Sequence, residues 1–65
     1  MFQTRRDNDE IRIALVDDHV RVRDELAAVL KREVGFSIVG TGASSDEAVT
    51  LAENLLPDVL LLDIN

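Results

Sequence analysis

The stretch IRIALVDD at residues 11–18 decides the fold class. Its first six residues are mostly apolar and rich in the β-branched residues that favour strands. The run then leads directly into a pair of acids, Asp17 and Asp18. The pattern predicts a strand over residues 11–16 that delivers two carboxylates to its carboxyl end.

The segment after this acidic pair has the periodicity of an amphipathic helix. Apolar residues recur at helical spacing, and charged residues occupy the other face. The apolar positions are Val22, Leu26, Val29 and Leu30, and the charged ones are Arg23, Asp24, Lys31 and Arg32. Gly35 is expected to end this helix, because glycine commonly terminates helices. A second short strand is predicted over residues 36–39.

A second helix and a third strand complete the pattern. Ser44 and Glu47 form the S-x-x-E capping box that starts many helices. The apolar stripe of this helix comprises Ala48, Leu51, Ala52 and Leu55. Pro57 is expected to stop the helix, and residues 59–62 read as a strand.

The order of these elements is βαβαβ, which predicts a parallel sheet with helices packed on it and right-handed crossovers. We therefore expect an α/β fold, the βαβαβ half of a flavodoxin-like doubly wound sheet with strand order 2-1-3. The strand at 59–62 is apolar on both faces, a pattern typical of a central buried strand. An apolar, uncharged strand at a sheet edge is a liability, so the sequence reads as though further strands follow.

Composition limits the remaining possibilities. The chain has 65 residues, of which residues 1–10 are polar and aperiodic, so we expect a disordered tail at 1–10 and one small domain at 11–65. The net charge of −6 argues against binding nucleic acid. The apolar run at 59–62 is far shorter than the ~20 residues that span a bilayer. The N-terminus shows no signal-peptide pattern and the sequence has no cysteine, so we expect a cytoplasmic protein without membrane contact.

Three acids are predicted to meet at one edge of the sheet. Asp17 and Asp18 follow the first strand, and Asp63 follows the third. In a sheet of order 2-1-3 these strands are neighbours, and their carboxyl ends flank the crevice where open α/β sheets bind ligands. Crowded carboxylates repel one another unless a cation intervenes, and an all-oxygen site suits Mg²⁺. Taken singly, each acid could instead cap a turn.

These residues also carry a family resemblance. The segments IALVDDH at 13–19 and PDVLLLDIN at 57–65 resemble receiver domains of bacterial two-component response regulators. The Asp-Asp-His triplet, the IVG at 38–40 and the ASSDEA at 43–48 are most similar to the NarL/LuxR-type branch. The resemblance covers residues 11–65 and corresponds to the N-terminal half of such a domain.

The resemblance implies a role for each matching residue. Asp63 would be the phosphoacceptor, and Mg²⁺ would be held by Asp17, Asp18, Asp63 and the backbone carbonyl of Asn65. The first helix would form part of the surface that meets a sensor histidine kinase. The protein would be a phosphorelay module of a transcription factor, and it would be no enzyme beyond catalysing its own phosphorylation.

The sequence also departs from that family. A receiver domain continues with two more strands and three more helices, which supply a Ser or Thr and a Lys to the site. These 65 residues contain neither the Ser or Thr nor the Lys that those later strands would supply. Lys31 cannot replace that Lys, because it lies at the far end of the first helix. These 65 residues do not include a counterpart of the family's DNA-binding domain. We therefore expect a truncated receiver domain with impaired phosphoryl transfer.

Two other functions remain open. One is a non-catalytic fragment that self-associates through the edge at 59–62, as a homodimer or by exchange of the last helix and strand. The other is a dinucleotide-binding βαβ unit, because IVGTGASS at 38–45 resembles its glycine-rich turn. However, Ser45 replaces the third glycine, and we interpret Gly40 and Gly42 as flexible loop residues.

Individual polar residues have further possible roles. A dehalogenase-type phosphatase would need an acid at the position of His19, so that motif fails. His19 could be a zinc ligand beside Asp18, although a loop or N-cap role is favoured. Arg21 and Arg23 could contact phosphate or a kinase, although solvated positions on the helix surface are favoured.

Overall fold

The computed structural model describes residues 10–64. The tail expected at 1–10 therefore lies, apart from Glu10, outside the described residues. Strands and helices alternate along the chain, as predicted. The elements are β1 (Ile11–Asp17), α1 (Val20–Lys31), β2 (Phe36–Gly42), α2 (Ser45–Leu55) and β3 (Val59–Asp63).

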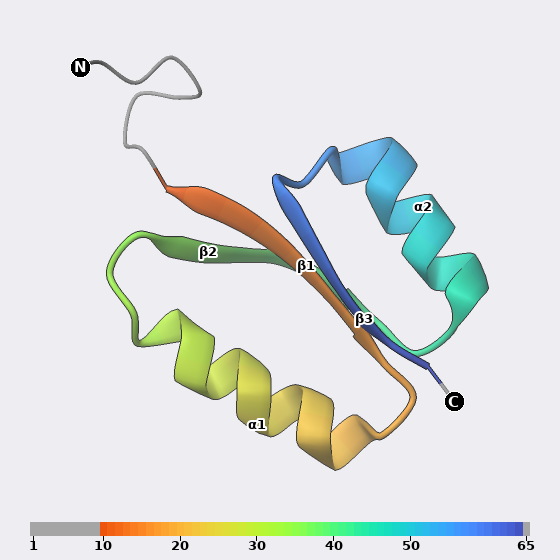
Figure 1. The fold of residues 1–65 in the computed structure, drawn as a ribbon, viewed down its shortest axis with the longest axis horizontal. Coiled ribbons are helices and arrows are strands. Elements are labelled where there is room, and N and C mark those ends of the chain that lie inside the picture. The colour runs from red at the N-terminus through yellow and green to blue at the C-terminus, as the bar shows by residue number, and fades with distance from the viewer. Residues whose placement is uncertain (1–9, 65) are drawn as a thin grey trace.

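The strands form one parallel sheet in the order β2-β1-β3. Helix α1 covers one face of this sheet and α2 covers the other (Figure 1). Both helices lie over β1 and β2, and β3 receives little cover. The expected α/β fold with strand order 2-1-3 is confirmed. Within residues 10–64, neither helix is long and apolar enough to cross a membrane.

The core is centred on β1, because this strand has neighbours at both edges and helices on both faces. Ala14 and Val16 are completely buried, and Leu15 is 1% exposed. The helices contribute small residues to the same core, Ala27 from α1 and Ala48 from α2. Small side chains at these contacts let both helices approach the sheet closely.

Strand β2 is longer than predicted, and this corrects the interpretation of its glycines. Gly40 and Gly42 lie within the strand, where they pair with Ala14 and Val16 of β1, and they do not form a flexible loop. A Cβ atom at Gly40 would lie 2.8 Å from methyl groups of Leu51 and Leu55 in α2.

The glycines of β2 therefore allow α2 to pack tightly against the sheet. Because they belong to the strand, residues 10–64 do not form the glycine turn that a dinucleotide site places between strand and helix. The register with β1 shifts by one residue between Ile13 and Ala14, which marks a bulge in this part of the sheet.

The ends of α2 follow the predicted signals. The hydroxyl of Ser44 accepts a hydrogen bond from the backbone N–H of Glu47 at 3.2 Å, as expected for an N-cap. The Glu47 carboxylate in turn accepts from the backbone N–H of Ala43. Leu56 ends the helix in the left-handed region with φ 48°, and Pro57 follows.

The end of α1 differs from the prediction that Gly35 terminates it. The helix ends at Lys31, where the N–H groups of Arg32 and Glu33 bond to the carbonyls of Val29 and Leu30 and tighten the last turn. Gly35 comes later, in the turn to β2, with φ +98°.

The apolar face predicted for α1 is only partly buried. Val22 and Val29 are each 50% exposed, whereas Ala27 makes the buried contact with the sheet. Helix α1 sits over β1 and β2, and two residues of its apolar stripe, Val22 and Leu26, border the open space beside β3. By contrast, all four residues of the α2 stripe are buried or half-buried.

Candidate metal centre

The structure brings the predicted acids to one edge of the sheet. Asp17 and Asp63 are the last residues of β1 and β3, and they are direct partners in the parallel register. Asp18 follows Asp17 in the short connection to α1. The topology that sequence patterning predicted therefore places all three carboxylate residues at the same strand ends. Asn65, expected to contribute a carbonyl, lies outside the described residues.

Asp17 and Asp18 sit in different surroundings. The Asp17 side chain is 5% exposed, and its Oδ1 accepts a hydrogen bond from the backbone N–H of His19 at 2.8 Å. The Asp18 side chain is 35% exposed. A buried carboxylate beside a more accessible one gives a site that is fixed on one side and open to solvent on the other.

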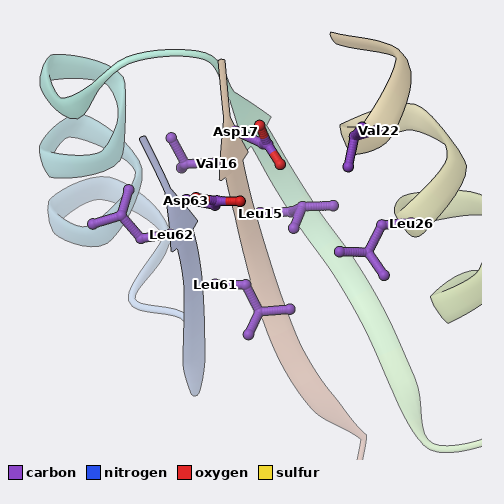
Figure 2. A pocket seen from close by; sticks show the side chains of 8 residues that line it. All are labelled: Leu15, Val16, Asp17, Val22, Leu26, Leu61, Leu62 and Asp63. Carbon is purple, nitrogen blue, oxygen red and sulfur yellow. The ribbon is translucent and has the colours of Figure 1, made fainter. Parts of the chain in front are cut away.

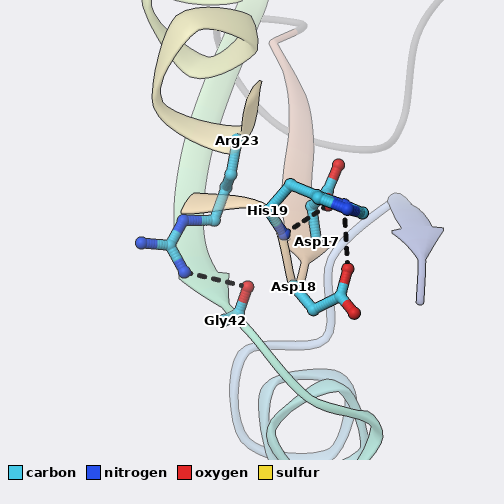
Figure 3. A network of polar contacts seen from close by, with 5 residues as sticks. All are labelled: Asp17, Asp18, His19, Arg23 and Gly42. Atoms are coloured by element: carbon cyan, nitrogen blue, oxygen red, sulfur yellow. Dashed lines mark hydrogen bonds and ion pairs between the residues drawn. The ribbon is translucent and has the colours of Figure 1, made fainter. Parts of the chain in front are cut away.

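The imidazole of His19 contacts both acids (Figure 3). Its Nδ1 lies 3.2 Å from Oδ1 of Asp17 and 3.0 Å from Oδ1 of Asp18. His19 is also the N-cap residue of α1, as favoured from sequence, but its side chain makes no cap hydrogen bond. The ring is directed to the two carboxylates instead.

The donor atoms present fit a small divalent cation. One ligand atom from each of Asp17, Asp18 and His19 lies within 4.8 Å of the others. Carboxylate oxygens are the donors that Mg²⁺ prefers, and an imidazole nitrogen would also suit Zn²⁺. Asp63 is not a member of this compact group, although its backbone is the register partner of Asp17.

Arg23 occupies a different position from the solvated one favoured from sequence. Its side chain is 17% exposed, and its Nη1 donates to the carbonyl oxygen of Gly42 at 3.2 Å (Figure 3). Arg21, by contrast, is exposed as expected. The sequence held one signal for this difference, because Arg23 stands four residues before the buried Ala27 and so shares its side of the helix.

Two hollows flank β3, one on each face of the sheet. The hollow beside α1 has a volume of about 290 Å³ and reaches from the acids to apolar side chains of α1 and β3 (Figure 2). The hollow beside α2 has a volume of about 420 Å³ and is almost wholly apolar. The apolar character of β3 follows from the sequence, but the separate hollow on each face does not.

Comparisons with known proteins give consistent matches. No family model matches the chain. It is 43% identical over 54 residues to the transcriptional regulatory protein LiaR of Bacillus subtilis, covering 83% of this chain and 26% of LiaR. It is 39% identical over 56 residues to the transcriptional regulatory protein DegU of Brevibacillus brevis, covering 86% of this chain and 24% of DegU. The response regulator protein VraR of Staphylococcus aureus is 39% identical over 54 residues, covering 83% of this chain and 26% of VraR.

A solved structure shows the same fold. The signal receiver domain of the response regulator NarL from Mycobacterium tuberculosis superposes with a TM-score of 0.81 and 31% sequence identity. The match covers 85% of this chain and 44% of the NarL chain. This chain thus spans about a quarter of the length of the curated relatives and under half of the solved domain.

Proposed function

We propose that this chain is part of a receiver domain of the NarL/LuxR-type response regulators, to which it is similar. In this role it would accept a phosphoryl group on Asp63, with Mg²⁺ at the adjoining acids. The observation that carries this proposal is the pairing of Asp17 with Asp63 at the carboxyl ends of neighbouring strands. That pairing puts a candidate nucleophile next to a candidate metal site.

The three acids differ in burial, and this difference supports a different role for each. Asp17 is held in place by burial and by the N–H of His19, so it suits a fixed ligand, and the more accessible Asp18 suits a second. Asp63 is exposed at the end of β3, which leaves its carboxylate free to approach a phosphodonor. Mg²⁺ would neutralise charge on the transferring oxygens.

The proposed transfer is a simple exchange of bonds. A carboxylate oxygen of Asp63 attacks phosphorus in line, an O–P bond forms, and the bond from phosphorus to the donor breaks with its electron pair leaving on the donor. Such transfer depends on positioning and charge stabilisation. Lys31 is the single lysine of the sequence, and it lies at the end of α1 that is far from the acids. No lysine of these 65 residues can therefore stabilise the charge at the acids, and we expect phosphoryl transfer to be slow.

The remaining parts of the proposal follow the family. The natural phosphodonor would be a sensor histidine kinase in the cytoplasm, and exposed residues of α1 such as Val20 would form part of its contact surface. The net charge of −6 supports a segment that does not itself bind nucleic acid. Self-phosphorylation would be the extent of its catalysis.

Incubation with acetyl phosphate and Mg²⁺ followed by intact-mass spectrometry tests the proposal. We expect slow addition of one phosphoryl group to the wild-type chain, and none to Asp63→Asn. Asp46→Asn is the matched control, because it removes an exposed acid in the first turn of α2 that does not belong to the compact group of Asp17, Asp18 and His19. Equal labelling of the Asp63→Asn and Asp46→Asn variants would contradict the assignment of Asp63. An intact receiver domain treated alongside should be labelled much faster.

A second candidate function is self-association, because β3 is open along its edge. Its apolar residues are exposed to between 36% and 55%, and a second copy could pair antiparallel with the edge at residues 59–62. Twofold pairing of this kind would make one six-stranded sheet, and closed twofold symmetry is the commonest oligomeric arrangement. Sedimentation over a concentration series tests this: a mass that stays monomeric throughout would exclude it.

A further inference from the structure

We infer that Arg23 is a positioning residue for the metal site: its side chain clamps the acidic turn of residues 17–19 to the end of β2. This inference rests on the proposed function only in taking Asp17 and Asp18 as the metal ligands. Arg23 itself need touch neither the metal nor the phosphoryl group.

The clamp is a closed ring of contacts around the acidic turn. The backbone N–H of Arg23 donates to the carbonyl of His19 at 2.9 Å, which fixes the far end of the turn to α1. The Arg23 guanidinium donates to the carbonyl of Gly42 at 3.2 Å. Gly42 is the register partner of Val16, the residue just before the turn. Figure 3 shows the guanidinium of Arg23 reaching Gly42, with Asp17, Asp18 and His19 together on the opposite side of Gly42.

The same connection extends to the start of α2. Ala43 follows Gly42, and its N–H donates to the carboxylate of Glu47 in the first turn of α2. One guanidinium thus links α1, the end of β2 and, through Ala43, the start of α2. The ends of β1 and β2 that carry and support the acids are thereby held in a single arrangement.

The surroundings of the guanidinium are poor for stability, which argues for a role beyond packing. Among residues 10–64, the buried Nε of Arg23 has no hydrogen-bond partner. The carboxylate of Asp24 lies 3.5 Å away, but it is 68% exposed and offers an ion pair without a hydrogen bond. A buried donor left without an acceptor is destabilising, and such local violations are expected at functional sites.

Electrostatics and positioning predict opposite results when Arg23 is removed. Loss of a positive charge from α1 should strengthen binding of a cation, by Coulomb's law. Loss of a clamp should weaken it, because residues behind metal ligands typically contribute about 10–100-fold to affinity. The sign of the change therefore distinguishes the two effects.

The test is a Mg²⁺ titration of the 65-residue chain, followed by the amide shifts of Asp18 and His19. We expect Arg23→Met to bind Mg²⁺ about tenfold more weakly than wild type, and Arg23→Lys, which keeps a charged donor, to recover part of the loss. Arg21→Met is the matched control, because it removes the same charge from an exposed position on the same helix. It should bind as tightly as wild type or more so.

A second readout needs no metal. The N–H of His19, which donates to Asp17, should exchange with solvent faster in Arg23→Met than in Arg21→Met. Mg²⁺ affinity and amide exchange that are alike in these two variants would overturn the inference. Should Arg23→Met not fold, Arg23→Lys is compared with wild type, and unchanged affinity and exchange there would overturn it equally. A wild-type chain without Mg²⁺ response would contradict the proposed function, and the exchange measurement would still decide the role of Arg23.

Discussion

Strands β1 and β3 have similar apolar sequences but opposite surroundings. In β1, residues 13–16 are at most 4% exposed, whereas in β3 residues 59–62 are between 36% and 55% exposed. The difference arises from neighbours within residues 10–64, where β1 pairs at both edges and lies beneath both helices, and β3 pairs with β1 alone. The composition of a strand thus indicates which surroundings it suits, whereas its place in the sheet determines how far its side chains are buried.

The two strands also divide the proposed chemistry. The end of β1 supplies a buried acid and an adjoining turn that are held by hydrogen bonds, and the end of β3 supplies an exposed acid. A rigid strand suits metal ligands, which need fixed geometry, and an open strand suits a nucleophile that must meet a second protein. The following predictions test this contrast.

The largest effect should be on the free energy of unfolding, when a leucine of β1 is truncated to alanine and compared with a leucine of β3. Leu15→Ala removes a side chain that is 1% exposed and should cost about 3–5 kcal/mol of unfolding free energy. A core of this size supplies roughly that amount in total, so the variant should be largely unfolded. Urea denaturation followed by circular dichroism measures the change.

Leu61→Ala is the matched comparison, because Leu61 is 37% exposed in β3. It should cost only about 1 kcal/mol, since much of its surface is already in water. Equal destabilisation by Leu15→Ala and Leu61→Ala would show that β3 is covered in solution, for example by another copy of the chain.

The second-largest effect should be that of lysine substitutions in β3 on self-association. Leu61→Lys and Leu60→Lys place a charge at the open strand, and each apolar side chain withdrawn from an interface is worth about 1.5–3 kcal/mol. We therefore expect the apparent dimer dissociation constant to rise at least about tenfold in either variant. Analytical ultracentrifugation measures it.

The two lysine variants also report the geometry of association. Leu61 lines the hollow beside α1, and Leu60 lines the hollow beside α2. Both lysine variants should weaken association if the copies pair through the strand edge. A larger effect of one variant would indicate that the second copy docks on the face of the sheet that carries that leucine. Added salt or Mg²⁺ should favour association, because each copy carries −6.

The acids of the two strands should differ in their effect on Mg²⁺. Asp18→Ala should abolish the Mg²⁺-dependent amide shifts of the turn, because Asp18 belongs to the compact ligand group. Asp63→Asn should weaken binding by less, because Asp63 lies outside that group, yet it should abolish phosphoryl labelling. Shifts confined to residues far from these acids would be inconsistent with the site.

The smallest effect should come from the contact that joins the two strands at their opposite end. The Arg12 guanidinium donates to the carbonyl of Leu56 at 2.9 Å, while its backbone N–H donates to Asp58. Arg12→Ala removes only the side-chain bond and should cost about 0.5–1.5 kcal/mol. Hydrogen exchange should show β3 amides losing protection before those of β2; uniform loss along the sheet would argue against a local role.

Local sequence signals accounted for much of the candidate site. The placement of Asp17, Asp18 and Asp63 at neighbouring strand ends followed from strand order alone. Arg23 did not, because a charge on an amphipathic helix is ordinarily solvated, and only packing showed that its guanidinium is enclosed. The roles of Gly40 and Gly42 were likewise hidden, because a glycine's purpose depends on which side chains approach it.

The sequence by itself determined the order of elements, the parallel sheet and the gathering of acids at one edge, because periodicity, caps and strand ends are local properties. Only the tertiary structure decided which apolar residues are buried. Val22 and Leu61 carry the same signal as Val16 and Leu15, yet they are 50% and 37% exposed whereas Val16 and Leu15 are buried. Burial depends on elements distant in the chain, and no local pattern encodes where those elements lie.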